Sequence, residues 1–317
     1  MEQGREAEID RVQVERLEAL RVLVIGEPCI DVIHKADGKK FNEPGGISYS
    51  VVGGAVLDDG VEVVPIIGIH PEDEPSFREL FDHLEPVNMA GIYSTRTRTR
   101  HVDLFYEDDN SRWECSTQPT EPTAFDKILP FLPSEGIHIN LISGSDVELE
   151  TLRLVRDTSA SSHIHLDLHN IVMEHLPDGR RVRVARPDYL RWCRFADTVQ
   201  LNEDEAQVID PSMPAREVLA ERILSTGAKA LVITLAEKGL VLFTRESGRI
   251  VERKFASQAS KIVDSTGCGD VFGAAFLHSL LIGNDIIRAV ESGIEVATSK
   301  LSSAGPGGLL RSMNPHV

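Results

Sequence analysis

The residue types best suited to chemistry lie near the carboxyl end of the sequence, in the segment DSTGCGDVFGAAF at positions 264–276. Gly267 and Gly269 leave room for a tight backbone turn and for close approach of a ligand. The apolar residues that follow indicate a helix, whose first N–H groups have no intrahelical partner and mark the positive end of its dipole. We therefore expect a binding site for negative charge at the start of this helix.

Asp270 lies in the first turn of the expected helix, beside that site. N–H groups of this kind stabilise the charge that spreads over a transferring phosphoryl group. A neighbouring carboxylate can accept the proton of an attacking hydroxyl. The segment predicts phosphoryl transfer, with Asp270 as general base and Gly267, Cys268 and Gly269 forming an anion hole. Cys268 is interpreted as a small packing residue, not a nucleophile. A glycine-rich helix start without a ligand is the simpler alternative, but the full DxTGxGDxFxxxF spacing is more specific than it requires.

The charge and motif content argue against several other functions. The formal net charge of −17 argues against nucleic-acid binding, which relies on lysine and arginine. The patterns GxxxxGK[ST] and GxGxxG do not occur, so P-loop and Rossmann nucleotide sites are not expected. The four cysteines are far apart and show no CxxC spacing, which argues against a disulfide framework or a zinc ribbon.

The sequence shows no pattern of a membrane span or an export signal. No stretch approaches the ~18 consecutive apolar residues of a membrane helix, and residues 1–20 are acidic without an apolar core. We therefore expect a cytoplasmic protein without a membrane partner. An acidic, arginine-rich surface is typical of salt-adapted proteins, but an ordinary acidic composition explains it too, so salt adaptation stays open.

One group of alternating residues suggests a metal site. His163, His165, Asp167 and His169 would share one face of a strand, and histidines two residues apart can chelate a metal. The intervening isoleucine and leucines form the other face, as in an ordinary strand, and no second group of ligands is evident. We therefore do not predict a transition-metal site here.

The elements that position these residues follow from the pattern of apolar runs. Short β-branched runs alternate with amphipathic helical patterns from residue 21 onward, which predicts an α/β fold with a mostly parallel sheet and helices on both faces. The expected strands span 21–26, 61–68, 137–143, 164–168, 198–201, 230–234 and 239–244, and the expected helices span 77–84, 149–158, 215–225 and 271–281.

Two segments interrupt this alternation. Residues 32–46 and 92–118 alternate polar and apolar side chains, and the turn residues Asp108–Asn110 predict an antiparallel hairpin within the second segment. We expect both segments to form a small β-sheet lid over a main domain that spans 21–317. Residues 1–20 are expected to be a helical or frayed leader.

The order of these motifs resembles the ribokinase-like (PfkB) family of sugar and nucleoside kinases. The segment DSTGCGD is similar to the DTxGAGD signature of that family, with Cys268 where alanine is usual. The further matches are VIGEPCID at 24–31, which resembles the opening strand, Pro44–Gly46, which resembles the lid hinge, Asn202–Glu205, which matches NxxE, and Thr234–Gly239, which resembles TxGxxG with Ala236 in place of a glycine. Together they cover about residues 21–308.

The resemblance implies a role for each motif. ATP would lie across Asn202, Thr234, Glu237, Gly239 and Thr266. Its γ-phosphate would lie at the anion hole. Mg²⁺ would be held indirectly, through Glu205 and water. The acceptor would contact Asp31, Gly45, Gly46 and Ser50. The resemblance also leaves a monovalent cation and a homodimer through the lid as open possibilities.

The acceptor is less defined than the chemistry. Ser50 stands where many family members have an asparagine that binds sugar hydroxyls, and serine lacks the bidentate amide. A sugar or polyol is the main expectation. A nucleoside is the alternative within enzymes, with Tyr49 and Phe105 as stacking surfaces. A nucleotide-binding regulatory protein without turnover is the alternative outside enzymes, and the presence of Asp270 argues against it.

Overall fold

The computed structural model describes residues 20–314 apart from 36–37, 58–59, 107–111, 118–119, 177, 179, 213–214 and 259–261. Residues 1–19 of the expected leader and the expected turn at Asp108–Asn110 therefore lie outside the described residues, whereas Leu20, the last residue of that leader, begins the first strand. Among the residues that are described, no helix is both long and apolar enough to cross a membrane.

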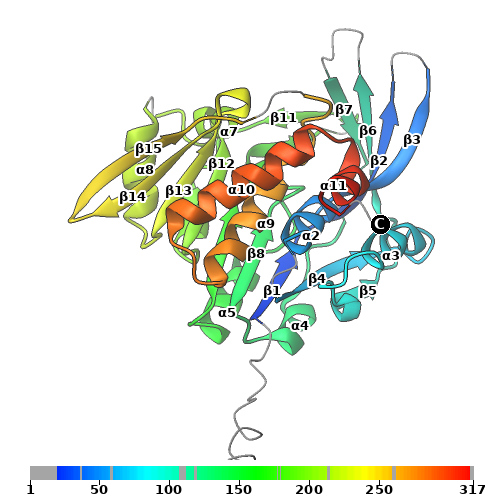
Figure 1. Cartoon of the computed structure of the whole chain (residues 1–317), viewed down its shortest axis with the longest axis horizontal. Coiled ribbons are helices and arrows are strands. Elements are labelled where there is room, and N and C mark those ends of the chain that lie inside the picture. Colours follow the sequence, from blue (N-terminus) through cyan, green and yellow to red (C-terminus); the bar gives the residue numbers. More distant parts are fainter. Residues whose placement is uncertain are drawn as a thin grey trace, which may run out of the picture.

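A large sheet forms the centre of the molecule, with strand order β15-β14-β13-β12-β9-β8-β1-β4-β5 (Figure 1). Neighbouring strands from β5 to β13 are parallel, and β14 and β15 add an antiparallel edge. The predicted mostly parallel sheet is confirmed. The strands are β1 Leu20–Ile25, β4 Val61–Ile69, β5 Ile92–Ser94, β8 Gly136–Asn140, β9 His163–Asp167, β12 Thr198–Asn202, β13 Ala230–Thr234, β14 Leu240–Glu246 and β15 Arg249–Phe255.

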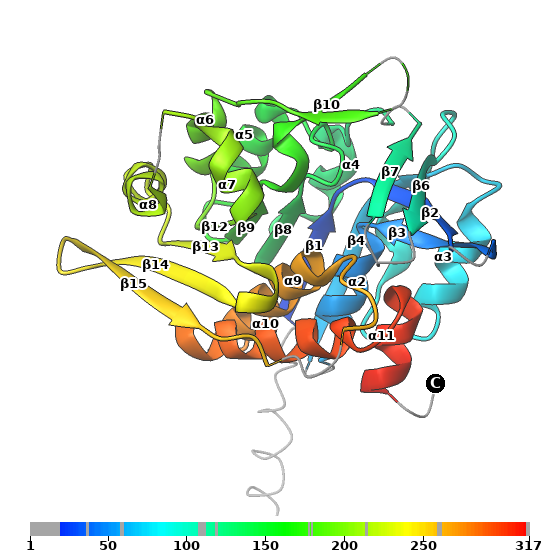
Figure 2. The ribbon, with the colours of Figure 1, turned by 90° about the horizontal axis from the view of Figure 1, so that it is seen from above.

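Helices cover both faces of this sheet (Figure 2). Strand β1 shows why: Leu23 and Ile25 join the core on one face, whereas Val22 and Val24 join the core on the other. One face carries α2 Ser48–Ala55, α9 Cys268–Leu281, α10 Ile286–Leu301 and α11 Gly305–Met313, and the other carries α4 Phe125–Ile128, α5 Leu149–Thr158, α6 Tyr189–Cys193, α7 Glu203–Ile209 and α8 Arg216–Leu224. Helix α3 Glu74–Phe81 and the short 3₁₀ turns η1 Met89–Gly91, η2 Leu129–Phe131, η3 His169–Val172 and η4 Ala236–Lys238 complete the helical elements described.

A separate four-stranded sheet, with order β3-β2-β6-β7, stands at one end of the molecule. Its strands are β2 Pro28–His34, β3 Lys40–Gly46, β6 Arg100–Tyr106 and β7 Arg112–Ser116. Two expected boundaries differ: the first segment starts at residue 28 instead of 32, and residues 92–94 of the second segment pair with β4 in the large sheet. The sequence pattern also missed the two-stranded hairpin of β10 Met173–His175 and β11 Arg181–Arg183.

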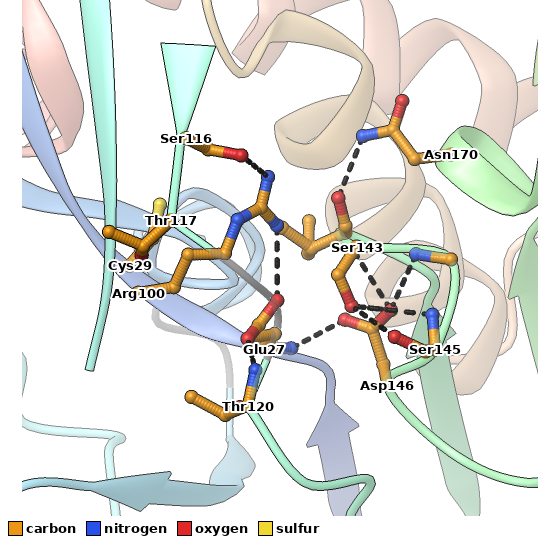
Figure 3. Close-up of polar contacts among 12 residues, drawn as sticks. Glu27, Cys29, Arg100, Ser116, Thr117, Thr120, Ser143, Ser145, Asp146 and Asn170 are labelled. Carbon is orange, nitrogen blue, oxygen red and sulfur yellow. Dashed lines mark hydrogen bonds and ion pairs between the residues drawn. The ribbon is translucent and has the colours of Figure 1, made fainter. Parts of the chain in front are cut away.

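A buried ion pair joins the two sheets (Figure 3). Only Gly26 and Glu27 separate β1 from β2. The Glu27 carboxylate contacts Nη1 of Arg100, the first residue of β6, at 3.0 Å, and both side chains are almost fully buried. The main-chain N–H of Thr120 donates to the same carboxylate, and the N–H of Glu27 donates to Asp146. Burial, together with the Glu27 charge, raises the pKa of Asp146 to about 6. Removing either member of such a pair leaves an unpaired buried charge.

Helices α2 and α9 approach each other closely at a glycine. A Cβ atom at Gly53 would lie 2.8 Å from Val271 Cα and 2.9 Å from Val271 O, which is too close for any side chain. The next residue, Gly54, has room, because its Cβ would meet Val63 and Ala274 at 3.7 and 3.8 Å. This contact places the amino end of α9 against α2.

The neighbouring glycines allow a matched test of this packing. Gly53→Ala is expected to lower the free energy of unfolding by about 1–3 kcal/mol, because the added methyl group overpacks the α2–α9 contact. Gly54→Ala should leave stability unchanged or raise it by up to about 1 kcal/mol, because alanine favours the helix. Urea unfolding of the two variants measures both values, and equal destabilisation would contradict the close contact at Gly53.

Candidate active site

The start of α9 forms one wall of a cavity of about 370 Å³. Gly267 is the N-cap with a φ of 76°, in the left-handed region that favours glycine. A Cβ atom there would also lie 2.2 Å from the Tyr49 ring. Most of the residues expected to form the site line this cavity, namely Asp31, Gly46, Asn202, Glu205, Thr266, Gly267 and Asp270. The lining also includes Tyr49, His169, Arg100, Arg181, Arg183 and apolar residues of the small sheet.

The carboxylate of Asp270 is held in a defined position. Its side chain is buried, and Asn140 Nδ2 donates to Asp270 Oδ1 at 2.8 Å. The Ser50 hydroxyl donates to the main-chain carbonyl of Asp270 at 3.4 Å. Asn140 is the last residue of β8, so a strand end orients the carboxylate through a neutral amide. Asn140 was not predicted, although its place at the carboxyl end of a parallel strand is a usual one for site residues.

Three further charged side chains surround Asp270. Ligand atoms of Asp167, His169 and Asp270 lie within 4.8 Å of one another, and His169 Nδ1 is 3.6 Å from Glu205 Oε1. Burial raises the pKa of Asp167 and of Glu205. Burial by itself lowers the pKa of His169, but the carboxylates of Asp270, Glu205 and Asp167 outweigh it and raise that pKa. The carboxylates therefore favour the protonated form of the His169 imidazole.

The remaining histidines of the alternating group do not join this cluster. His163 and His165 contact the Thr198 hydroxyl, and the His165 ring stacks on His138 at 5.2 Å beneath α9. The alternation therefore does not bring four ligands to one point. His163 and His165 lie along β9 beside Thr198, whereas Asp167 and His169 meet Asp270 at the carboxyl end of this strand. Among the described residues, the side chains close enough to share a metal are Asp167, His169 and Asp270.

The Asn202–Glu205 motif caps α7. Asn202 Oδ1 accepts from the Glu205 N–H at 2.9 Å, and Glu205 Oε2 accepts from the Asn202 N–H at 2.7 Å, which is a reciprocal capping box. The amide of Asn202 also donates to Glu205 Oε1 at 2.6 Å. Both oxygens of Glu205 thus have protein partners at the edge of the cavity. Carboxylates of this kind suit Mg²⁺, which keeps several waters when it binds proteins.

The other residues expected to bind nucleotide continue along the same edge of the sheet. Thr234 pairs with Asn202 at the carboxyl ends of β13 and β12, and Glu237 is exposed in the turn η4. Thr234, Glu237 and Gly239 do not line the cavity itself. Ala236, which replaces the usual glycine, has a φ of 50°, so the backbone there retains the conformation that glycine favours.

On the side of the small sheet, Asp31 reaches the cavity from β2, and Cys29 Sγ donates to its carboxylate at 3.2 Å. Gly45 lies behind that carboxylate: a Cβ atom there would be 2.2 Å from Asp31 Cγ. Ser50 does not reach the cavity. It is fully buried within α2, and its hydroxyl contacts His138 and Asn140 besides Asp270. We therefore no longer place Ser50 among the acceptor contacts.

The two aromatic candidates are placed differently from each other. Tyr49 lines the cavity beside Gly267. Phe105 does not line it and stacks on His34 at 4.3 Å. Val102 and Leu104 line the cavity, and Phe105 lies on the other face of β6 because strand side chains alternate. Phe105 is therefore not a stacking surface for a ligand in this cavity.

Comparison with known proteins agrees with this geometry. Residues 139–312 match the model of the pfkB family carbohydrate kinases. A cytidine kinase of Thermococcus kodakarensis is 27% identical over 297 residues, which cover 90% of this chain and 98% of that kinase. An adenosine kinase of Schizophyllum commune is 35% identical over 125 residues, 35% of this chain and 36% of that protein. A pyrophosphate-dependent kinase in the ribokinase family has a similar structure, with a TM-score of 0.74 and 22% identity over 94% of this chain and 100% of that one.

The family match spans more than half of the sequence, and the chain therefore belongs to the pfkB family of carbohydrate kinases. It is a phosphotransferase with a hydroxyl acceptor, which sets aside the alternative of a regulatory protein without turnover. The predicted family and the ribokinase-like fold are confirmed.

The buried histidines beneath α9 give the fold a predictable acid sensitivity. Burial lowers the pKa of His138 from 6.5 to about 3. The unfolded chain therefore binds more protons below pH 6.5, and stability falls as the pH drops from 6.5 toward 3. Between pH 7 and pH 5 this residue should remove about 2 kcal/mol from the free energy of unfolding.

His138→Gln is expected to reduce the pH dependence by that amount, measured by urea unfolding at pH 7 and pH 5. His83 lies on the surface, and His83→Gln serves as the control that keeps the wild-type pH dependence. Parallel pH profiles for wild type and His138→Gln would show that His138 is not held neutral in the fold.

Proposed function

We propose that this protein transfers the γ-phosphoryl group of ATP to a hydroxyl of a small molecule, a sugar or polyol, with Asp270 as general base. The observation that carries the proposal is the placement of Asp270 in the first turn of α9, inside the cavity that Asp31 reaches from the small sheet. The Asp270 carboxylate, the N-cap of α9 at Gly267 and the Asp31 carboxylate thus line one cavity.

In the proposed reaction Asp270 accepts the proton of the acceptor hydroxyl as its oxygen bonds to the γ-phosphorus. The bond from the γ-phosphorus to the β,γ-bridging oxygen breaks, and ADP retains the bonding electrons. The amino end of α9, with the Gly269 N–H and the positive end of the helix dipole, stabilises the charge on the transferring group. Asn140 keeps the Asp270 carboxylate oriented toward the acceptor.

The donor would extend from the start of α9 toward Asn202 and Thr234, whose strand ends are adjacent. Glu205 would hold Mg²⁺ through water, consistent with its two occupied oxygens. The ion would neutralise phosphate charge. The small sheet would act as a lid, because its apolar residues Val102 and Leu104 face the cavity and would exclude water during transfer.

A nucleoside is the second candidate acceptor. Apolar side chains form part of the cavity lining, and a flat base suits such a surface better than a small polyol does. These residues are Val102, Leu104, Ile142, Val172 and Met173. The cytidine kinase of Thermococcus kodakarensis, which this chain matches over almost its whole length, supports the same candidate. Tyr49 remains as an aromatic contact near the phosphate side.

A screen of acceptors tests the proposed function. Mg·ATP consumption is measured over sugars, polyols and nucleosides, with product masses checked, and pyrophosphate replaces ATP in a parallel series. We expect phosphorylation of at least one polyhydroxylated acceptor, and turnover of nucleosides alone would select the second candidate. Absence of a phosphorylated product in every reaction would contradict the proposal.

Asp270→Asn separates proton transfer from binding. The amide keeps the shape of the side chain but cannot accept the hydroxyl proton, so kcat should fall by about 10²–10⁴, the usual range for a general base. The shift in melting temperature caused by Mg·ATP should persist, because the helix N–H groups remain. Steady-state kinetics and thermal unfolding measure the two effects. A variant that keeps more than about a tenth of the wild-type kcat would show that Asp270 is not the base.

A further inference from the structure

Lys300 is a fully buried lysine at the end of α10, close to the start of α9. Its ammonium donates to Asp264 Oδ2 at 2.9 Å, to the main-chain carbonyl of Asp264 at 3.2 Å and to the carbonyl of Ser303 at 3.2 Å. It also lies 5.5 Å from the centre of the Tyr49 ring. An ammonium has three N–H donors, so three oxygens and an aromatic face give it a complete set of contacts.

These contacts fix the loop that leads into the anion hole. Asp264 opens the DSTGCGD segment, and its Oδ1 accepts from the N–H of Thr266 at 2.9 Å. Its other oxygen accepts from the N–H of Gly305 at 3.3 Å. Lys300 thereby ties the loop before α9 to the start of α11. The ammonium lies over the Tyr49 ring, and the same ring packs closely against Gly267.

The surroundings of this ammonium are those of a cation site. Two main-chain carbonyls and one carboxylate are oxygen ligands of the kind that bind monovalent cations. A buried positive charge is stable only where opposite charge and hydrogen bonds compensate for lost hydration. Asp264 provides that charge, and Glu43 adds a second carboxylate whose pKa is raised by burial and by Asp264. The chain fills this position with its own side chain.

We propose that Lys300 is a positioning residue that supplies a permanent cation beneath the anion-hole loop, so that phosphoryl transfer by this protein needs no added monovalent cation. The inference rests on the proposed function for its kinetic consequence. Its structural consequence, that an ammonium or a cation of similar charge must occupy this position for the loop to be ordered, can be measured without any phosphoryl acceptor.

Two substitutions of Lys300 separate charge from packing. Lys300→Met keeps the length of the side chain without the charge, and fills the position. Lys300→Ala removes the charge and leaves space for an ion. Lys229→Ala is the matched control, because Lys229 contacts Asp197 at the same 2.9 Å but its side chain is 69% exposed.

The three variants and the wild type are assayed with an accepted substrate in KCl, NH₄Cl and choline chloride at equal ionic strength. Wild type and Lys229→Ala should give the same rate in all three salts. Lys300→Ala should lose about 10–100-fold in kcat in choline chloride, because the loop is misplaced. K⁺ or NH₄⁺ should restore much of this loss, whereas Lys300→Met should stay impaired in every salt.

Thermal unfolding in the same salts, without substrate, provides the second measurement. K⁺ or NH₄⁺ should raise the melting temperature of Lys300→Ala above its value in choline chloride, and should not do so for wild type or Lys300→Met beyond the general salt effect. The melting temperatures can be measured even if no acceptor is found. Failure of the proposed function is therefore distinguished from failure of the inference about Lys300.

Three outcomes would overturn the inference. The first is a wild-type enzyme that requires K⁺ or NH₄⁺, since its cation site would then lie elsewhere. The second is wild-type kcat in Lys300→Ala in choline chloride. The third is loss of activity in both Lys300 variants with no cation effect on rate or melting temperature, which would mean that Lys300 only packs. If Lys300→Ala does not fold in any salt, the rate of the wild type in the three salts tests the inference: equal rates support it, and a requirement for K⁺ or NH₄⁺ overturns it.

Discussion

In the proposed reaction, the amino end of α9 has to attract a phosphoryl group and hold a carboxylate within the same helical turn, and these two demands oppose each other. The helix dipole favours both negative groups there, but their mutual repulsion has to be offset. Asn140 fixes the Asp270 carboxylate with a neutral amide and adds no cation that would compete for phosphate. The neighbouring carboxylates raise the pKa of His169, which favours a positive charge close to Asp270. Gln200 holds Asp167 and the carbonyl of Gly269 with a single amide nitrogen. The strand ends thus provide the geometry that the helix end needs.

The second constraint is the connection between the two sheets. Arg100 opens β6, and Glu27 precedes β2, so that two of the connections between the small sheet and the rest of the fold meet at one buried ion pair. Asp146 and the loop after β8 complete the same group of contacts on the side of the large sheet. Since β8 also ends in Asn140, the joint of the small sheet and the orientation of Asp270 depend on the same short stretch of chain.

The sequence predicted what depends on local pattern. The parallel sheet, the start of α9 and the motifs that meet at its cavity follow from apolar periodicity, glycine placement and resemblance to a family. Asn140 and Asp167 could have been found from the rule that parallel strands end at one edge of the sheet. The inward orientation of Ser50 could not be found in this way, because it depends on α2 starting two residues earlier. Arg181 lies on a three-residue strand, which is too short for its pattern to be distinguished from a loop.

The contact between Gly53 and Val271 also bears on how such a protein diversifies. In the proposed assignment, Asp31 and Gly46 on the acceptor side precede Gly53 in the chain, and the phosphate-binding residues follow position 200. Recombination between related genes near the middle of the sequence would therefore exchange acceptor preference and leave the donor half intact. Such a chimera would keep its stability only if the parent that supplies the first half carries a glycine at position 53, since a larger residue there would overpack the contact with α9 of the other parent. This glycine thus restricts which halves are interchangeable.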